Sequence, residues 1–374
     1  MMRVAQYLSQ YPGRDGTSAY GTGLSKAMNL LWPGSCPVIS NRADHREAPE
    51  GVEVLRYPSH TTRPGALPPD MISDLVDGKL ELNGVVIHGV FNPRAVALAG
   101  KLRKNGIPYA FMPHDPYVSG LLKHGYLKKS LFLRLFEQPM IRRAKGVILL
   151  AESHEKYLRN LGYKGAVKIV PNGCDPESLP LNAGNMVTPG HNEVAKILYL
   201  GRMDRNHKGL DLLLQGFAKF LAGRNPAVEL ILTGNDWEDR QELEKLSTKL
   251  GIGNFVQFTG PRSENSIQIH GEADVVILPS RFDGFGLTIV EAMLASRPVM
   301  VSKEAGIASH VERSGGGIIF EPGVDAIASA FVELLGKRED WEKMGKENHL
   351  YVIENLTWEA TARETMRAYS DFFC

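Results

Sequence analysis

Cysteine is scarce in this 374-residue chain, which has only Cys36, Cys174 and Cys374, far apart from one another. This usage gives no metal-site spacing and favours a reduced, cytoplasmic compartment over a secreted one. Long apolar runs are also missing, since no stretch approaches the roughly 20 residues that a membrane-spanning helix needs. The opening residues 1–8 predict a first strand rather than a signal peptide, because no longer apolar core follows them.

Net charge is nearly absent too. The formal net charge is +1, so the chain as a whole has no drive toward nucleic acid. Two aspartates separated by one residue, a pattern that metal-dependent nucleotide-sugar enzymes often use, do not occur. Clusters of His and Cys with metal-ligand spacing are also missing. The sequence therefore implies neither a bound metal nor another cofactor.

Short apolar strands that alternate with helical patterns are what the chain does contain, in two successive series. The first series of strands is expected at residues 3–8, 52–57, 85–88, 109–112, 147–150 and 167–170. The second series is expected at residues 197–200, 228–232, 256–258, 275–278, 299–302 and 318–320. Such alternation predicts an α/β fold with parallel sheets covered on both faces. Leu181–Glu193, rich in Gly, Asn and Pro, is the best linker between the two series.

We therefore predict two Rossmann-like, doubly wound domains that face each other across a deep cleft. Ligands of such sheets bind beyond the carboxyl ends of the strands. The first loop of this kind, Pro12–Gly23, carries Gly21-Thr22-Gly23, and a helix is expected to begin near Leu24. These glycines can bring backbone N–H groups to a phosphate oxygen. They match neither the Walker loop nor the dinucleotide fingerprint, so the signal is weak.

The most informative stretch is 273–293, where a buried strand leads into a loop with two glycines and then into a helix. Glycine lets the backbone approach a ligand closely, and the helix expected from Leu287 offers unpaired N–H groups to an anion. Asp283 lies in the loop and Glu291 about one turn into the helix, with seven residues between them. The stretch predicts a crevice for an anionic or sugar ligand.

Two cations follow the first strand of the second series. Arg202 and Lys208 flank the loop Gly201–Gly209, which opens onto an apolar helix. Fixed cations beside helix N–H groups suit a dense anion such as diphosphate. The alternative is that both are solvated surface charges, which is the usual place of charged residues. The nearby acidic loop favours the functional interpretation.

A histidine follows the predicted strand at 109–112. His114 is placed there to meet a substrate hydroxyl, since ligands gather at the carboxyl ends of parallel strands. The alternative, favoured on sequence alone, is a turn histidine bonded within its own loop. His88, at the end of an earlier predicted strand, is a weaker candidate of the same kind.

Residues 119–145 hold seven basic side chains against one acidic residue, Glu137, with leucines and phenylalanines interleaved. The pattern is typical of an amphipathic helix with a basic face that can lie on an anionic membrane. The alternative is a domain helix whose basic side is merely solvated, and it is slightly favoured.

These motifs resemble the retaining glycosyltransferases of family 4, which have the GT-B fold. Asp283–Glu291 is similar to that family's pair of acidic residues, and Gly201-Arg202 with Lys208-Gly209 looks like its phosphate-binding pair. Pro171–Asp175 resembles the end of its N-terminal domain, and Phe258–Gly260 the strand and loop beside its nucleobase. The resemblance covers nearly the whole chain, in the right order.

The resemblance implies an acceptor-binding domain over 1–180, a nucleotide-sugar domain over 181–355, and a C-terminal helix over 356–374 that packs back on the first domain. The predicted activity moves a hexose from a UDP- or GDP-linked sugar to a saccharide or lipid-linked acceptor, with retention of configuration and without metal. The protein would be cytoplasmic, with any attachment at the inner face of the membrane through 119–145. A nucleotide-sugar epimerase is the main alternative, and a phosphorylase-like enzyme or a binding module are others.

Roles carried over from the family fall on matching residues. Arg202 and Lys208 would neutralise the diphosphate leaving group, His114 would lie near the reacting carbon, and Glu291 would hold the ribose hydroxyls. Asp283 would be the fourth catalytic residue, but the family usually has Glu there. The shorter side chain leaves open whether it contacts the donor sugar or the sugar is seated differently. Other donor contacts are implied at Gly23, Gly234, Gly260, Pro261, Arg262, Phe285, Gly286, Leu287 and Thr288.

Overall fold

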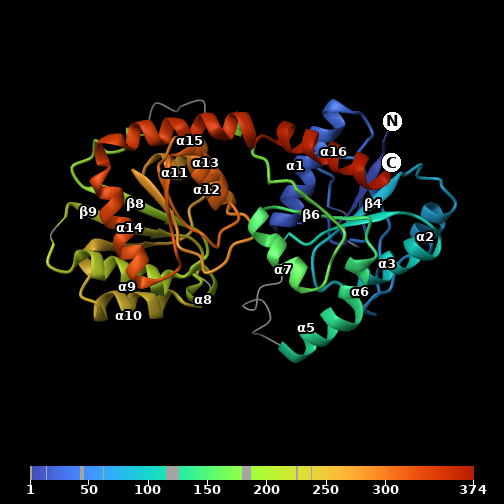
Figure 1. Cartoon of the computed structure of the whole chain (residues 1–374), viewed down its shortest axis with the longest axis horizontal. Coiled ribbons are helices and arrows are strands. Elements are labelled where there is room, and N and C mark those ends of the chain that lie inside the picture. The colour runs from blue at the N-terminus through green and yellow to red at the C-terminus, as the bar shows by residue number, and fades with distance from the viewer. Residues whose placement is uncertain are drawn as a thin grey trace. The chain divides into compact units, whose positions relative to one another are not determined.

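The computed structural model (Figure 1) describes residues 2–13, 15–42, 46–61, 63–114, 126–178, 187–224, 226–236 and 238–374. The chain forms two compact units. Unit 1 comprises residues 1–173 together with 358–374, and unit 2 comprises residues 174–357. The domain boundary predicted at 180, and residues 181–186 of the predicted linker, lie outside the described residues.

Unit 1 is built on a seven-stranded parallel sheet in the order β3-β2-β1-β4-β5-β6-β7. Its strands are β1 (Val4–Tyr7), β2 (Val38–Ser40), β3 (Val54–Arg56), β4 (Gly84–His88), β5 (Tyr109–Met112), β6 (Gly146–Leu149) and β7 (Ala166–Ile169). The strands are mostly buried, as expected for a sheet with helices on both faces. All were predicted except β2, which has only three residues. The order reverses between β1 and β4.

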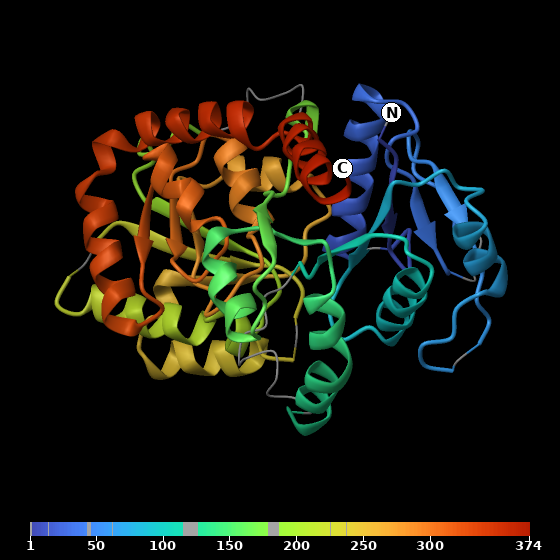
Figure 2. The same ribbon diagram turned by 45° about the vertical axis from the view of Figure 1, so that its right-hand side comes forward.

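The helices of unit 1 cover both faces of this sheet. They are α1 (Gly16–Leu31), α2 (Pro69–Val76), α3 (Pro93–Lys104), α5 (Tyr126–Phe132), the π-helix η1 (Leu133–Glu137), α6 (Gln138–Arg142), α7 (Glu155–Asn160) and α16 (Trp358–Phe373). Figure 2 shows α16, in red, beside α1, in blue. Buried residues of α2, α3, α6 and α7 share one apolar core with the strands. The last helix of the chain thus completes the first unit.

The predicted loop Pro12–Gly23 is wrong over most of its length, because α1 begins at Gly16. Asp15 caps the helix by accepting a hydrogen bond from the Ser18 N–H. A β-carbon at Gly21 would overlap Leu8, and one at Gly23 would overlap the Trp358 indole. These glycines therefore serve close packing inside a helix rather than the approach of a loop to phosphate.

Two further glycines of unit 1 receive aromatic side chains from α16. A β-carbon at Gly84, on β4, would overlap the ring of Phe373, and one at Gly146, on β6, would overlap Phe372. The side chains of Phe372 and Phe373, like that of Trp358 at Gly23, therefore occupy places that glycine leaves open. The fit of α16 against the sheet depends on the absence of side chains there.

Unit 2 has a six-stranded parallel sheet in the order β10-β9-β8-β11-β12-β13. Its strands are β8 (Ala195–Leu200), β9 (Val228–Thr233), β10 (Val256–Thr259), β11 (Val275–Leu278), β12 (Val299–Ser302) and β13 (Gly317–Phe320). The sequence predicted each of these strands. The order reverses between β8 and β11, so the loops after these two strands form the switch point.

Helices lie on both faces of the second sheet, as Figure 1 shows. They are α8 (Arg205–Lys208), α9 (Leu210–Leu221), α10 (Arg240–Lys249), α11 (Ser266–Gly271), α12 (Leu287–Leu294), α13 (Ala308–Ser314), α14 (Val324–Gly336) and α15 (Trp341–Asn355). Helix α9 packs against α10 and α14, whereas α12 packs against α11 and α15. This is the doubly wound arrangement that the alternating pattern predicts. Within the described ranges, no helix is long and apolar enough to cross a membrane.

Candidate functional site

The switch point of unit 2 brings two predicted site residues together. Lys208, at the end of α8, places its Nζ 2.5 Å from Oδ2 of Asp283 in the loop after β11. Both side chains are largely buried, at 16% and 13% exposure. The same carboxylate oxygen lies 3.4 Å from the hydroxyl of Ser280. An ammonium group has three N–H donors, so this pair leaves Lys208 with donors for another oxyanion.

Glycines allow the loops at this edge of the sheet to approach one another. Gly209 has φ +67°, and a β-carbon there would overlap the carbonyl of Pro279, which follows β11. Gly234, after β9, has φ +145°, and a β-carbon there would overlap the carbonyl of Gly201. Only glycine fits such positions. Gly234 therefore shapes the loop that carries Arg202, whose carbonyl accepts a hydrogen bond from Tyr199 at 2.6 Å.

The predicted helix after the acidic loop is α12, and its N-terminus is set by Gly286 in the left-handed region, with φ +98°. A β-carbon at Gly286 would press on Leu278 at 3.0 Å and Ile307 at 3.1 Å. The Ile307 N–H donates to the carbonyl of Phe285 at 2.7 Å, which ties the loop to the segment after β12. The first N–H groups of α12, on Leu287 and Thr288, have no partner within the helix. They are available to a ligand anion.

Glu291 lies on α12 with 36% of its side chain exposed. One of its carboxylate oxygens is 3.8 Å from Nε2 of His270, a histidine with no exposed surface. Neither ring nitrogen of His270 has a hydrogen-bond partner in the described part of the chain. The half-exposed carboxylate can accept hydrogen bonds from two neighbouring hydroxyls.

An ion pair ties the loop after β11 to helix α9. Arg281 donates to both carboxylate oxygens of Asp211 at 2.6 and 2.7 Å, and its backbone N–H donates to the carbonyl of His207. Burial lowers the pKa of His207, and the charge of Lys208 lowers it further, whereas Asp283 opposes the shift. His207 therefore packs as a neutral ring against Phe282.

The other predicted donor contacts lie at the end of β10, where Gly260 faces open space. Arg262 forms ion pairs with Glu264 at 2.8 Å and Glu272 at 2.6 Å. These carboxylates raise the pKa of its guanidinium, Glu272 more than Glu264. Any ligand that uses Arg262 must share it with them. The loop Gly260–Arg262 is one strand removed from β8.

His114, the predicted catalytic residue of unit 1, is paired with His88. Nδ1 of His88 lies 2.8 Å from Nε2 of His114, and Nε2 of His88 lies 2.7 Å from Oε1 of Gln6. Burial lowers the pKa of His114 to about 4, and it lowers the pKa of His88 well below its ordinary value. The alternative of a histidine bonded within its own loop is therefore wrong, because the His114 ring contacts His88 on a neighbouring strand. Asp115, which follows in the chain, lies outside the described residues.

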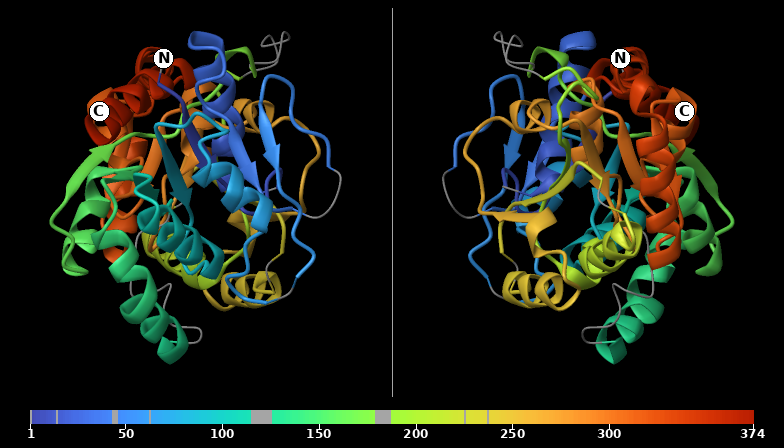
Figure 3. Two further views of the ribbon diagram at one scale, coloured as in Figure 1. Left: turned by 90° about the vertical axis from the view of Figure 1, so that its right-hand side faces the viewer. Right: turned by 90° about the vertical axis from the view of Figure 1, so that its left-hand side faces the viewer.

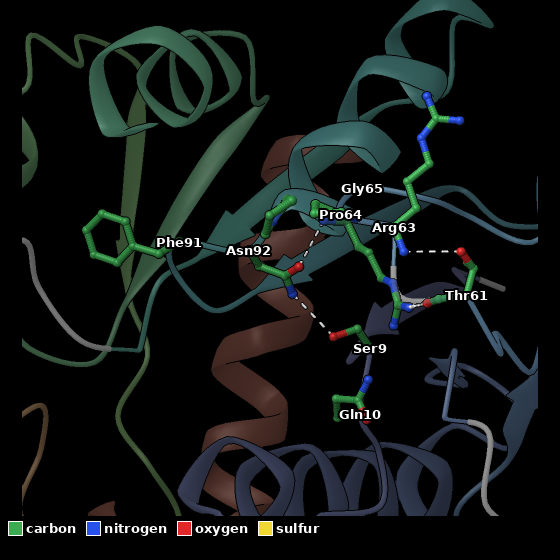
Figure 4. Close-up of a pocket in the computed structure, with 10 residues that line it drawn as sticks. Ser9, Gln10, Thr61, Arg63, Pro64, Gly65, Phe91 and Asn92 are labelled. Atoms are coloured by element: carbon green, nitrogen blue, oxygen red, sulfur yellow. Dashed lines mark hydrogen bonds between the residues drawn. The ribbon is translucent and has the colours of Figure 1, made fainter. Parts of the chain in front are cut away.

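Unit 1 has a pocket of about 360 Å³ at its own switch point, shown in Figure 4. Its lining includes Ser9 after β1 and Asn92 before α3. The Asn92 amide donates to the Ser9 hydroxyl at 3.2 Å. Phe91, whose ring points away from these two side chains in Figure 4, has an unusual φ of +54°. Its N–H donates to the buried carboxylate of Glu137 at 2.6 Å. The pocket wall is thus held by the π-helix η1.

Sequence reasoning missed Gln6, which contacts His88 of the histidine pair, and Tyr369, which contacts Gln6. Gln6 lies on β1 and Tyr369 on α16, and the Gln6 amide nitrogen lies 2.6 Å from the Tyr369 hydroxyl. The signal for Gln6 was present, because a polar residue interrupts an otherwise apolar buried strand. No signal could have paired Tyr369 with it, since 363 residues separate them.

In the described ranges, no three His, Cys, Asp or Glu side chains gather as metal ligands.

The chain has two doubly wound units, which define a Rossmann-like class of protein. One unit has a cation–carboxylate pair beside a helix N-terminus at its switch point. Residues 188–350 match the family model described as Glycosyl transferases group 1, and residues 36–178 match that of Glycosyltransferase Family 4. The chain belongs to this glycosyltransferase family.

The individual relatives match part of this chain. An uncharacterized glycosyltransferase of Methanocaldococcus jannaschii is 28% identical over 54% of this chain, and D-inositol 3-phosphate glycosyltransferase of Corynebacterium urealyticum is 26% identical over 68%. The matched stretches span 53% and 65% of these relatives' own lengths.

Solved structures support the fold over the whole chain. Sucrose-phosphate synthase of Thermosynechococcus elongatus is 19% identical, with a TM-score of 0.74 over 100% of this chain and 99% of its own. Anabaena Alr3699/HepE in complex with UDP is 18% identical, with a TM-score of 0.72 over 99% of this chain and 100% of its own. The predicted GT-B fold of two Rossmann-like units is confirmed.

Proposed function

We propose that this protein is a retaining glycosyltransferase that moves a hexose from a UDP- or GDP-linked sugar to a saccharide or lipid-linked acceptor. This proposal rests on the ion pair between Lys208 and Asp283 at the switch point of unit 2, beside the N-terminus of α12. Breaking a glycosyl–phosphate bond develops negative charge on the departing phosphate. Cations and N–H groups aimed at that phosphate stabilise the transition state more than the ground state.

The donor is assigned to unit 2. Arg202 and Lys208 would bind the diphosphate, and the first N–H groups of α12 would complete its coordination. Glu291 would accept hydrogen bonds from the ribose, and the loop Gly260–Arg262 would lie beside the base. UDP, and UDP with glucose, are bound in structures of Anabaena Alr3699/HepE, which makes UDP the first donor nucleotide to test.

Asp283 takes a particular role in this proposal. Its carboxylate is engaged by Lys208, so its first task would be to orient that ammonium group. A glutamate, longer by a methylene, could reach the sugar hydroxyls more easily. We therefore expect the donor sugar to lie farther from Asp283 than from Lys208.

The acceptor is assigned to unit 1. The pocket at its switch point offers hydroxyl and amide groups from Ser9, Gln10 and Asn92, and the guanidinium of Arg94. Hydroxyl and amide groups suit a saccharide, whose recognition needs many hydrogen bonds. His114 would contact the reacting sugar from the same unit.

The main alternative, an epimerase of the same fold, would convert donor without any acceptor. The decisive experiment measures the melting temperature with a panel of nucleoside diphosphates and nucleotide-sugars, because a ligand of the native state raises it by mass action. The stabilising sugar is then incubated with and without candidate acceptors. Transfer only with acceptor, with the anomeric configuration kept, supports the proposal. Epimerised donor without acceptor would favour the alternative.

Contact with an anionic membrane is a second proposal, and exposed apolar residues favour it. Leu131, Leu135 and Phe136, on α5 and η1, are 58%, 54% and 50% exposed. Figure 3 shows α5, in green, projecting from unit 1. Basic residues of the same stretch include Lys128, Lys129 and Arg134, whereas residues 119–125 lie outside the described part. Sedimentation with anionic vesicles should fall steeply with salt, and the absence of binding at low salt would refute this contact.

A further inference from the structure

A series of polar side chains connects the C-terminal helix to His114 inside unit 1. The Gln6 amide nitrogen donates to the Tyr369 hydroxyl at 2.6 Å, and the Gln6 carbonyl oxygen lies 2.7 Å from Nε2 of His88. Nδ1 of His88 lies 2.8 Å from Nε2 of His114. Gln6, His88 and Tyr369 are buried, at 0%, 4% and 1% exposure. Water therefore has little access to these contacts.

The order of donors and acceptors in this series fixes where the protons are. A carbonyl oxygen can only accept, so the Gln6 oxygen requires a proton on Nε2 of His88. A neutral His88 then has a lone pair on Nδ1, which must accept from Nε2–H of His114. A neutral His114 is left with its lone pair on Nδ1. That nitrogen has no hydrogen-bond partner in the described part of the chain.

The Gln6 side chain also contacts a second buried group, the Cys36 thiol. Burial raises the pKa of the Cys36 thiol to about 12, and hydrogen bonds with Ser25 and Gln6 oppose that shift. The Gln6 side chain thus lies beside two groups with lone pairs, the Tyr369 hydroxyl and the Cys36 sulfur. The Ser25 hydroxyl lies 3.6 Å from the same sulfur. In this orientation the amide nitrogen donates to the Tyr369 hydroxyl and the carbonyl oxygen accepts from Nε2 of His88.

Burial favours the neutral form of His114, and a nearby charge opposes it. His88 on β4 and Tyr20 on α1 contact the ring, with centroids 5.1 Å away in each case. The charge of Asp15, the cap of α1, raises the pKa of His114. Burial lowers it by more, to about 4. His114 is therefore neutral across the physiological range.

The backbone of His114 is also unusual, with φ +65°. A non-glycine residue in the left-handed region is strained and persists only where its surroundings hold it. Such strain gathers at functional sites, because it fixes the direction of a side chain. The strain and the hydrogen-bond series both act on the same ring.

We propose that Gln6, His88 and Tyr369 are positioning residues that hold His114 as the Nε2–H tautomer and so present the lone pair of Nδ1 to the sugar substrate. This inference rests on the proposed function, which supplies the substrate. His114 would accept a hydrogen bond from a sugar hydroxyl and would not donate one. The C-terminal helix would therefore contribute to catalysis from a residue that never touches substrate.

The test reads the tautomer directly, from the ¹⁵N shifts of labelled histidine in the full-length protein at neutral pH, assigned with a His114→Gln variant. We expect His114 to show a protonated Nε2 and an unprotonated Nδ1. A protonated Nδ1, or an imidazolium, would overturn the proposal. This measurement on the unsubstituted protein needs neither turnover nor a positioning variant that must fold.

A near-isosteric variant should invert the arrangement. In Gln6→Glu the carboxylate favours a doubly protonated His88, whose Nδ1–H then donates to His114. The proton of His114 is forced onto Nδ1. We expect kcat to fall by about 10²-fold, the lower end of what acid–base positioning supplies, with KM changed only a few-fold. An inverted tautomer with unchanged kcat would overturn the proposal.

Tyrosine variants provide a matched control. Tyr369→Phe removes the acceptor that orients the amide and should give a mixture of His114 tautomers with a several-fold lower kcat. Tyr109→Phe removes a buried hydroxyl of the same sheet, which donates to the Met140 carbonyl at 2.7 Å, and should change neither. Equal effects of the two variants would overturn the proposal. If the unsubstituted protein shows the expected tautomer but turns over no nucleotide-sugar, the proposed function fails and the proton arrangement stands.

Discussion

The two units hold their candidate site residues by opposite means. In unit 2 the contact is an ion pair, in which Nζ of Lys208 lies 2.5 Å from a carboxylate oxygen of Asp283. In unit 1 the contact is neutral, because burial lowers the pKa of His88 and His114. Charge suits the binding of a diphosphate, and a neutral ring of fixed tautomer suits a hydroxyl. Charge in one unit and proton placement in the other can therefore be altered separately.

The largest expected effect is on the ionic side. Lys208→Ala should lower kcat/KM by about 10²- to 10³-fold, as the loss of one preorganised charge-stabilising group does. Arg202→Ala should act in the same direction. The measurement is steady-state transfer with the donor found by thermal shift, with circular dichroism to show that each variant folds.

Two controls keep this result specific. Lys219→Ala removes a lysine of the same unit, paired with Asp325 at 2.7 Å but 58% exposed, and should leave transfer unchanged. Lys208→Ala should also lower stability by about 1–3 kcal/mol, because Asp283 is left without its partner. The double variant Lys208→Met with Asp283→Asn should regain stability but not transfer. Recovery of transfer would show that Lys208 acts only as a structural partner.

A smaller effect is expected on the neutral side. His114→Ala should lower kcat by about 10²-fold with little change in donor KM, because one hydrogen bond to the reacting sugar is lost while the diphosphate contacts remain. Thermal shift with the nucleoside diphosphate should be the same as for the unsubstituted protein. A His114 variant that loses nucleoside diphosphate binding would contradict the separation between the units.

The smallest effect is on stability in acid. Burial lowers the pKa of His114, and that of His310 in unit 2, to about 4 in the folded state. Unfolding restores the ordinary pKa, so the unfolded chain takes up protons first as pH falls. Stability is full above about pH 6.5 and is lost toward pH 4, by about 2 kcal/mol for each such histidine at pH 5.

Urea unfolding of the unsubstituted protein and of His310→Gln should distinguish the units. The variant lacks the titration of His310. Its free energy of unfolding should therefore fall less between neutral pH and about pH 5, by the contribution of one histidine. His310 contacts the Tyr351 hydroxyl at 3.0 Å, so some stability should also be lost at every pH. An unchanged pH dependence would show that His310 is not held neutral.

Much of the fold was predictable because strand and helix periods are local. The sequence predicted strands over residues 109–112 and 275–278, and β5 and β11 cover the same residues. The errors have a common cause. Glycine usually indicates a loop, but Gly21 and Gly23 lie inside α1 because Leu8 and Trp358 need the space. That need arises from residues distant in sequence, so no local pattern contains it.

The candidate site was predictable one residue at a time but not as contacts. Lys208 and Asp283 were each identified from their position after a strand, yet their ion pair depends on the neighbouring places of β8 and β11. His88 and His114 were both noted at strand ends. Their pairing follows only from the adjacency of β4 and β5.

The glycines that receive the aromatic side chains of α16 have a consequence for synthesis. During translation, residues 1–173 leave the ribosome before the 184 residues of unit 2, and residues 358–374 follow later still. Until then the places beside Gly23, Gly84 and Gly146 lack the rings that fill them. Unit 2 is continuous in sequence and can fold as it emerges. The first unit to be made is therefore the last to be finished, and its exposed apolar surface is where we expect a chaperone to bind the nascent chain.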